Sequence, residues 1–415
     1  MHHQTHGARY AGAAEKFSFP GIRRIENKNR DDTRVFITSM HGSSLLSAKA
    51  SSGSRYTASV LLLLLFSLSS LNGQQRHTSP SPNFKNEVRV LVEKFRIEHR
   101  VPGVTLAVAL HDSLVWEAAF GLADVENDVV LSPQSVFRIA SISKPIAAIA
   151  VMQLVEQGKV SLDDDIRTYV PAFPKKRWPV TLRHILTHTS GIRHYRPGEF
   201  LIKDHFDTLE QAIAIFREDS LKFQPGTQFS YSSYAFNLLA GVVEKAAGMS
   251  FEQYLQKFVW EPAHMRRTFF EHQLVIVPLR SRQYIVREGE LFNAPFVDLS
   301  IKWAGGGMIS SAGDLIRLHI ALDKGLLLSA DTRRLMQTPY KLSNGKTISK
   351  GLAWSISRDS EGHTIVSHSG GATGGTTFLG RIPETGFALA ILTNLQGVGK
   401  PLRELFQAIS HSAGY

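Results

Sequence analysis

The sequence predicts an α+β fold, in which a mainly antiparallel sheet is built from both chain ends, is flanked by helices and carries an inserted all-helical lobe. Apolar runs typical of strands occur at residues 103–120 and again after residue 351, whereas the segment between them shows the 3.6-residue rhythm of amphipathic helices. Strands from the two chain ends can share one sheet only if the intervening segment folds outside it. We therefore expect a cleft between the sheet and the inserted lobe, which is a usual place for a ligand.

The composition is that of an ordinary globular protein and excludes some kinds of chemistry. Of the 415 residues, 43% are hydrophobic and 20% are charged, which is enough apolar material for a large core. The chain has no cysteine, so disulfides, thiolate nucleophiles and Cys-based zinc sites are excluded. Its net charge is +11, but the basic residues are scattered along the chain rather than clustered, so we expect no nucleic-acid partner.

Residues 1–73 are interpreted as a leader that contains a signal-peptide-like segment. The apolar run at 58–71 is shorter than the roughly 20 residues that a membrane-spanning helix needs. Lys49 and Arg55 precede this run and small residues follow it, which is the arrangement of a secretory signal that is cleaved near Gly73. We therefore expect an exported protein, periplasmic or extracellular, with no stable membrane span after cleavage. Mitochondrial import and a retained membrane anchor are the alternatives.

A Ser/Pro-rich linker at 74–83 leads into the first regular elements. Residues 88–95 place apolar side chains at helical spacing and predict a helix. GVTLAVAL at 103–110 and SLVWEAAF at 113–120 are apolar runs separated by a tight turn, so they predict a β-hairpin. These elements begin a domain that we expect to span 84–415.

The rest of that domain divides into a helical segment and a late group of strands. Helices are predicted where apolar residues recur at helical spacing, in TLRHILTH, LEQAIAIF, AFNLLAGVVEKAAG and FEQYLQKFV. Strands are predicted in GLAWSIS, TIVSHSG, GTTFLGRI and FALAILTN, and a last helix is predicted from about Pro401. We therefore assign a sheet lobe to about 84–158 and 302–415, and a helical lobe to about 159–301.

Ser141 and Lys144 stand where the apolar segment IASISKPIAAIAV turns into a helix. Residues three apart share one helix face, and Pro145 suits a first turn, so we expect the helix to start at Ser141. A serine hydroxyl becomes a nucleophile when a base takes its proton, and a lysine is such a base where burial and nearby cations lower its pKa. Ser143 faces another way. Taken alone, the spacing also fits a capping serine and a surface lysine.

Two further motifs supply what a nucleophilic serine needs. FQPGTQFSYSSYAF places Tyr231 and Ser233 at the end of a Pro-Gly loop, where a helix begins. IVSHSGGATGG places His368, Ser369 and Gly370 at the end of an apolar strand, followed by glycines that let backbone approach a ligand closely. The three motifs, in this order, indicate nucleophilic catalysis.

These motifs make the chain resemble the serine β-lactamase and penicillin-binding protein superfamily. Within it, the chain is similar to the class C-like branch, whose second motif begins with Tyr, and especially to the mitochondrial β-lactamase-like serine proteases of animals and their bacterial relatives. The resemblance extends from about Asn86 to the C-terminus and is carried by FRIASISK, SGIRHY, YSSYAFNLLA, VDLSIKWAGGG and HSGG. It implies a serine hydrolase of the β-lactamase/transpeptidase-like fold, acting on a peptide or small-molecule substrate without metal or cofactor.

The resemblance also implies roles for individual residues. Ser141 would be the nucleophile that forms an acyl-enzyme, Lys144 its base partner, and Tyr231 the group that carries protons to and from the leaving group. His368 would position the substrate and bias the Tyr231 proton, so we expect activity to fall below about pH 6. The backbone N–H groups of Ser141 and Gly371 would form the oxyanion hole.

Two departures from the family pattern bear on the substrate. The second motif usually ends in Asn but has Ser233 here, and the third usually opens with Lys but has His368. Ser233, Ser369 and Gly370 are the expected substrate contacts. The departures favour a peptidase or esterase over an efficient antibiotic-degrading enzyme. The alternatives are a true β-lactamase or D,D-peptidase, and a non-catalytic relative that binds peptides or forms filaments.

Two other patterns are interpreted as structural. His184 and His188 are one helical turn apart, but Ile185 stands where a zinc protease motif has Glu, so we expect a turn fixed by His188 and Gly191 rather than a metal site. The glycines of WAGGGMISSAGD lack the ending of a nucleotide-binding loop, and Ser311 is interpreted as the cap of a helix.

Overall fold

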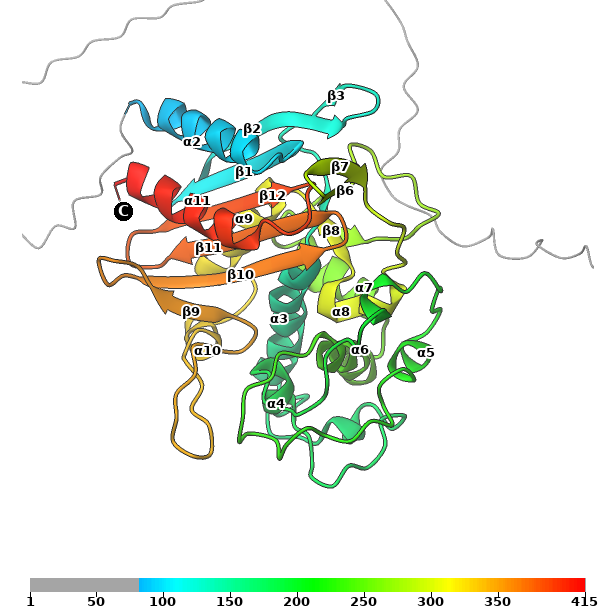
Figure 1. Ribbon diagram of the computed structural model, residues 1–415. Helices are drawn as coiled ribbons and strands as arrows, with labels where there is room; N and C mark the ends of the chain where they lie inside the picture. The colour runs from blue at the N-terminus through cyan, green and yellow to red at the C-terminus, as the bar shows by residue number, and fades with distance from the viewer. Residues whose placement is uncertain (1–81, 415) are drawn as a thin grey trace, which may run out of the picture. The chain divides into compact units, whose positions relative to one another are not determined.

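The computed structural model describes residues 82–414 (Figure 1). The predicted leader at 1–73 and nearly all of the linker at 74–83 lie outside the described residues, and so does the predicted signal segment. Within 82–414, no helix is both long enough and apolar enough to cross a membrane.

A seven-stranded antiparallel sheet is the central element of this part of the chain (Figure 1). Its strand order is β3-β2-β1-β12-β11-β10-β9, so strands from the beginning and the end of the domain meet where β1 pairs with β12. This confirms the predicted sheet built from both chain ends. The strands are β1 (Gly103–Leu110), β2 (Ser113–Asp124), β3 (Val129–Val130), β9 (Ser355–Arg358), β10 (Thr364–Ala372), β11 (Gly375–Ile382) and β12 (Phe387–Thr393).

Helices cover both faces of the sheet. On one face, α2 (Phe84–Glu98) and α11 (Gly399–Ser412) pack side chains such as Val92 and Phe406 against Leu106 and Leu389 of the central strands. On the other face, α9 (Ala312–Asp323) packs against β1 and β12, where the strands present small residues such as Ala107. Because β1 is buried on both faces, its sequence is a continuous apolar run rather than an alternation.

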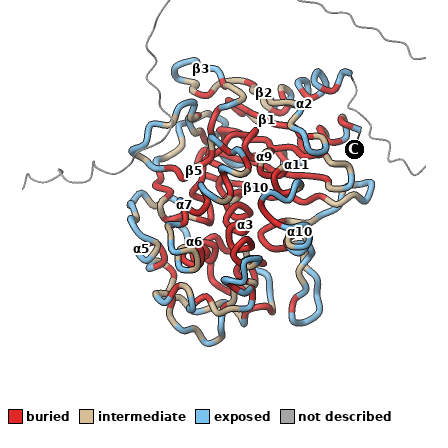
Figure 2. Tube along the Cα trace, turned by 180° about the vertical axis from the view of Figure 1, so that it is seen from behind, coloured by how far each residue is buried: buried red, intermediate tan, exposed pale blue. Residues whose placement is uncertain are grey.

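The segment between β2 and α9 consists of helices joined by long loops and packs around α3 (Ser143–Glu156) and α6 (Ser233–Ala247). Both helices are buried along most of their length, as the red tube in Figure 2 shows. α3 was assigned to the sheet lobe by sequence, but it packs against α6 and α8 and shares one core with both parts of the structure. The shorter helices are α4 (Leu182–Leu186), α5 (Leu209–Ile213), α7 (Phe251–Leu255), α8 (Trp303–Gly306) and α10 (Ala330–Met336).

The predicted all-helical lobe is wrong in one respect, because it contains short strands. β5 (Phe269–Phe270) joins β4 (Phe137–Arg138) and β8 (Met308–Ser310) in a three-stranded sheet, and β6 (Tyr284–Arg287) forms a hairpin with β7 (Glu290–Asn293). The hairpin turn at Glu288 and Gly289 has positive φ at both residues, 50° and 83°, as a tight two-residue turn requires.

Three predicted element boundaries also differ from the structure. α3 begins at Ser143 rather than Ser141, because a 3₁₀ turn precedes it. The strand predicted from Gly351 begins only at Ser355, since the chain turns at Ala353, which has a φ of 64°. α11 begins at Gly399, two residues before the predicted start at Pro401.

Candidate active site

Ser141 lies in a 3₁₀ turn, η1 (Ala140–Ile142), that leads directly into α3. Ala140 has a φ of 47°, a left-handed conformation that few L-residues adopt, so the chain turns sharply just before Ser141. Pro145 is in the first turn of α3, where its missing N–H costs no helical hydrogen bond. The buried α3 thus fixes Ser141 against the core.

Ser141 Oγ lies within hydrogen-bond distance of two side chains. Lys144 Nζ is 3.0 Å away and Tyr231 OH is 2.8 Å away. The structure therefore brings together the first two motifs, although Ser141 and Tyr231 are 90 residues apart in sequence.

Lys144 is completely buried and has only neutral oxygen atoms around its amine. Besides Ser141 Oγ, its Nζ contacts Ser233 Oγ at 2.9 Å and the carbonyl oxygen of Gly305 at 2.5 Å. Burial, followed by the charge of Lys302, lowers the pKa of Lys144 well below its usual value. A neutral amine fits these contacts, because two N–H groups can donate to Gly305 and Ser233 while the lone pair accepts from Ser141. Lys144 is thus able to take the Ser141 proton.

Tyr231 immediately precedes α6, the helix that carries Ser233. Ser232 is the N-cap of α6, and its hydroxyl accepts a hydrogen bond from the N–H of Ala235. Burial raises the pKa of Tyr231 to about 12, although contacts with Ser141 and Ser233 partly oppose this. The phenol is therefore neutral near pH 7 and can donate a proton rather than accept one.

Two histidines of the RHILTHTSGIRHY segment hold the Tyr231 motif in place. His188 Nδ1 accepts the backbone N–H of Ser232 at 3.3 Å, and His194 Nδ1 accepts that of Ser233 at 3.2 Å. The ring of His188 also packs on Tyr231, with centroids 4.2 Å apart. Burial lowers the pKa of both histidines, so the acceptor nitrogens stay free of protons. This bears out the expected structural role of His188, which sits at a turn with a φ of 56°.

The third motif lies on β10, which runs beside η1. Gly370 packs tightly there, since a Cβ at this position would lie 2.2 Å from the carbonyl oxygen of Ile139. Gly371 lines the pocket beside Ser141, whereas Ser369 is exposed and does not line it.

The predicted pH-sensitive role of His368 is not supported. Within residues 82–414, His368 Nδ1 bonds to the carbonyl oxygen of Ser369 at 2.8 Å, and the ring makes no hydrogen bond to Tyr231. Burial, and then the charge of Lys144, lowers the pKa of His368 to about 3. His368 is therefore neutral on both sides of pH 6.

A pocket of about 200 Å³ opens beside Ser141 and is lined partly by residues that the motifs do not include. His194, Tyr195, Phe200 and Lys302 are the large side chains among them. Three of these four lie in SGIRHY and VDLSIKWAGGG, two stretches that carry the family resemblance, so their place near the site was foreseeable. The full lining is Ala140, Ser141, His194, Tyr195, Phe200, Tyr231, Ser233, Leu299, Lys302, Gly305, Gly306, Gly371 and Ala372.

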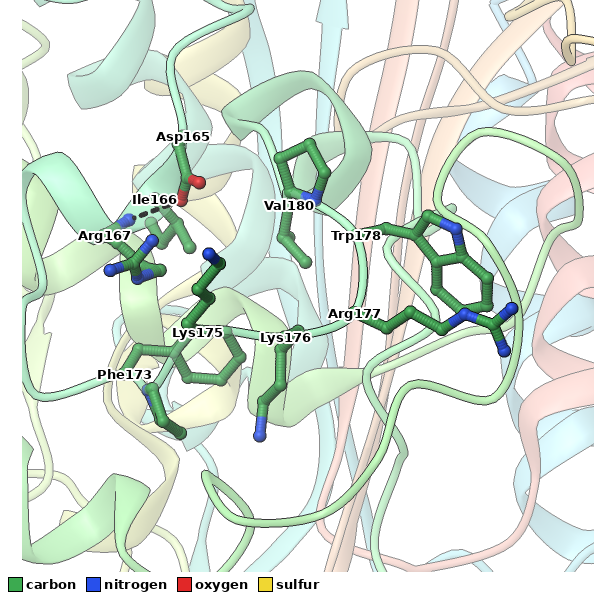
Figure 3. Close-up of a pocket in the computed structure, with 11 residues that line it drawn as sticks. Asp165, Ile166, Arg167, Phe173, Lys175, Lys176, Arg177, Trp178 and Val180 are labelled. Carbon is green, nitrogen blue, oxygen red and sulfur yellow. Dashed lines mark hydrogen bonds between the residues drawn. The ribbon is translucent and has the colours of Figure 1, made fainter.

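A second hollow of about 110 Å³ lies in the inserted segment, between Asp165 and Val180 (Figure 3). Basic side chains, among them Lys176 and Arg177, line it, and the Arg177 guanidinium carbon lies 4.5 Å from the centroid of the Trp178 ring. It shares no lining residue with the pocket at Ser141 and has no serine, histidine or tyrosine in its wall. It therefore offers neither a hydroxyl nor an imidazole for the chemistry proposed at Ser141.

Known proteins share both sequence and fold with this chain. The family model described as Beta-lactamase matches residues 88–413. The human serine beta-lactamase-like protein LACTB, mitochondrial, is 28% identical over 75% of this chain and 76% of that protein. Penicillin-binding protein 4* of Bacillus subtilis is 28% identical over 79% of this chain and 76% of that protein. The solved D-amino acid amidase of Ochrobactrum anthropi has a TM-score of 0.71 at 22% identity, covering 79% of this chain and 98% of its own, and this likeness shows the fold.

Proposed function

Because this chain belongs to the beta-lactamase family, we propose that it is a serine hydrolase that cleaves a peptide, amide or ester bond through an acyl-enzyme at Ser141. The family membership confirms the resemblance drawn from the sequence motifs. The observation that carries the proposal is the position of Ser141 Oγ, 3.0 Å from Lys144 Nζ and 2.8 Å from Tyr231 OH. Nucleophilic catalysis by serine needs such a neighbouring base and proton donor.

The acylation step moves one proton from the serine to the leaving group. Ser141 Oγ forms a bond to the substrate carbonyl carbon while Lys144 takes the hydroxyl proton. As the bond to the leaving group breaks, Tyr231 donates its proton to the leaving nitrogen or oxygen. Tyr231 then regains a proton from Lys144 by way of the Ser233 hydroxyl, which contacts both groups and is not acylated. Water releases the acyl group in a second, equivalent step.

The negative charge that develops on the carbonyl oxygen needs fixed donors. We assign this role to the backbone N–H groups of Ser141 and Gly371, which both line the pocket. A Cβ built on Gly371 meets no atom within 4 Å, so the space beside this residue is open to a substrate. Loss of one such donor costs about 3–4 kcal/mol in other hydrolases.

The free edge of β10 supports an extended peptide or amide as the substrate. β9 pairs with β10 only as far as Ser367, and beyond that point β11 is the only strand partner of β10 within the described residues. An extended chain can add to such an edge through main-chain hydrogen bonds. Ser233 and His368, in place of Asn and Lys, favour a peptidase or esterase over an antibiotic-degrading enzyme.

A fluorophosphonate probe tests the proposed function directly. It should label the wild-type protein at Ser141, and Ser141→Ala should abolish both labelling and turnover of 4-nitrophenyl esters. A screen of esters, peptides, D-amino-acid amides and nitrocefin then orders the substrate classes. Labelling that persists in Ser141→Ala, or a folded wild-type protein that the probe leaves unlabelled, would refute the acyl-enzyme. Rapid nitrocefin hydrolysis would instead support the alternative that the protein is a β-lactamase.

The leader supports a separate proposal about location. We propose that it directs the chain out of the cytosol, by export with cleavage near Gly73 or, as for the mitochondrial relative, by import. N-terminal sequencing of the native protein, together with cell fractionation, separates the two routes. A cytosolic protein that keeps residues 1–73 would contradict both.

A further inference from the structure

Lys302 is a buried cation in the wall of the pocket beside Ser141, with a fractional exposure of only 4%. Its Nζ lies 4.0 Å from the centroid of the Phe200 ring and donates a hydrogen bond to the Phe200 carbonyl oxygen at 3.2 Å. Among residues 82–414, this is its single hydrogen bond, and no carboxylate forms an ion pair with it. An ammonium has three N–H donors, so two remain for a ligand.

The pocket carries positive charge without an acidic counterpart. Lys302 lines it, and none of the lining residues is Asp or Glu. Glu271, the acid that acts on Lys302 electrostatically, already pairs with Arg138 at 2.6 Å and with Arg280 at 3.5 Å. An unpaired buried cation is costly, and an anion in the pocket would offset this cost.

Lys302 is better placed than Lys144 to bind an anion. Lys144 already contacts Ser141, Ser233 and the carbonyl of Gly305. Burial, and then the charge of Arg138, lowers the pKa of Lys302 to about 7, and a bound carboxylate would favour the protonated form.

We propose that Lys302 forms an anion subsite and that the reaction at Ser141 prefers substrates with a carboxylate near the scissile carbonyl. This inference rests on the proposed function and specifies its substrate class. Phe200 and Tyr195 lie beside the ammonium, with ring centroids 4.0 and 6.0 Å from Nζ, and they limit the access of water. A charge-assisted hydrogen bond in such surroundings is stronger than one at an open surface.

A pair of esters of similar size tests the preference. 4-Nitrophenyl butyrate is neutral, whereas the mono-4-nitrophenyl ester of glutaric acid carries a carboxylate. The wild-type protein should favour the anionic ester in kcat/KM. Lys302→Met should lower the ratio of anionic to neutral kcat/KM by about tenfold or more, and Lys302→Arg should keep most of it. A ratio that does not change in Lys302→Met, or a wild-type preference for the neutral ester, would overturn the proposal.

Lys176 provides a matched control on the same molecule. It lines the separate hollow of Figure 3, donates a hydrogen bond to the carbonyl of Arg217, and lies 5.1 Å from the Phe173 ring centroid, so it repeats the lysine–carbonyl–phenylalanine arrangement of Lys302. Lys176→Met should leave the ratio of the two esters unchanged. A drop equal to that of Lys302→Met would show a general effect of lost positive charge and would contradict a local subsite.

A binding measurement separates this proposal from the catalytic one. In the Ser141→Ala protein, which cannot form an acyl-enzyme, glutarate should bind more tightly than the neutral glutaramide when both are followed by ligand-observed NMR. Adding Lys302→Met should weaken glutarate binding by about tenfold and leave glutaramide unaffected. If glutarate binding depends on Lys302 but the wild-type protein hydrolyses no ester, the anion subsite is supported and the proposed hydrolase is refuted. If the wild-type protein hydrolyses esters but glutarate and glutaramide bind equally well, the hydrolase is supported and the anion subsite is refuted.

Discussion

Lys144 Nζ and Ser233 Oγ lie 2.9 Å apart, so the amine that faces the nucleophile is also held by the first residue of α6. The contact joins α3 to α6 across the buried part of the site. A hydroxyl at position 233 can orient the amine, but it lacks the amide group with which the family's usual Asn holds an acylamino substituent. Ser233 can therefore still orient the Lys144 amine, but it presents a hydroxyl rather than an amide group to the substrate.

Ser233→Ala should reduce kcat/KM for 4-nitrophenyl butyrate by about tenfold, because the neutral amine loses one of the contacts that orient it toward Ser141. The melting temperature should stay close to that of the wild type. Wild-type kinetics in this variant would show that Gly305 and Ser141 are sufficient to hold Lys144.

Ser143→Ala is the matched control for that variant. Ser143 is next to Lys144 in sequence, but its hydroxyl accepts the backbone N–H of Met308 at 3.3 Å and faces away from the pocket. Its loss leaves a buried donor without a partner, which should lower the free energy of unfolding by about 1–3 kcal/mol while kcat/KM changes little. Denaturant unfolding and ester kinetics separate the two effects.

Tyr231→Phe should slow ester and amide hydrolysis by about 100-fold or more, because it removes the proton donor 2.8 Å from Ser141 Oγ. The loss should be smaller for 4-nitrophenyl esters than for amides, since nitrophenolate leaves without needing a proton. Equal losses for the two substrates would mean that Tyr231 acts on the nucleophile and not on the leaving group.

The pH dependence should follow Lys144 and not His368. Lys144 accepts a proton only when neutral, and its pKa lies well below the usual value, so activity should fall as the pH falls through that pKa. His368, with a pKa of about 3, stays neutral over the neutral range. The acid limb of kcat/KM for the neutral ester should therefore have the same midpoint in His368→Gln. A midpoint displaced by about one unit in that variant would restore the pH-sensitive role of His368.

The sheet and the three motifs were predictable because they rest on local signals. Continuous apolar runs such as 103–110 mark strands buried on both faces, and the Ser141 and Lys144 spacing marks one helix face. The hairpin at 284–293 was not predicted, because its arms, YIVR and ELFN, are only four residues long and do not alternate apolar and polar residues. Its Glu-Gly turn is the feature that could have revealed it.

The electrostatics of the site were less accessible to sequence. His368 is a neutral group because its ring is buried, and no local pattern encodes how much protein covers a strand end. Lys302 lies in VDLSIKWAGGG, which places it near the site, but the sequence does not show that its amine is buried there. Such properties depend on tertiary packing, which places distant segments around one amine or one imidazole.

Gly305 and Gly306 are neighbours in α8 with different surroundings. A Cβ on Gly305 would lie 2.6 Å from the carbonyl oxygen of Ser233, whereas a Cβ on Gly306 would find its nearest atom, in Ala140, at 3.7 Å. The carbonyl of Gly305 also accepts a hydrogen bond from Lys144. Gly305→Ala should therefore push α8 away from α6, lower the free energy of unfolding by about 1–3 kcal/mol and impair catalysis.

Gly306→Ala should unfold at nearly the wild-type denaturant concentration, because an ordinary van der Waals contact needs no displacement. Comparing the two alanine variants in chemical unfolding and in fluorophosphonate labelling isolates the close approach of α8 to α6. If Gly305→Ala is as stable and as rapidly labelled as Gly306→Ala, then the tight packing behind Lys144 is not what keeps its amine directed at Ser141.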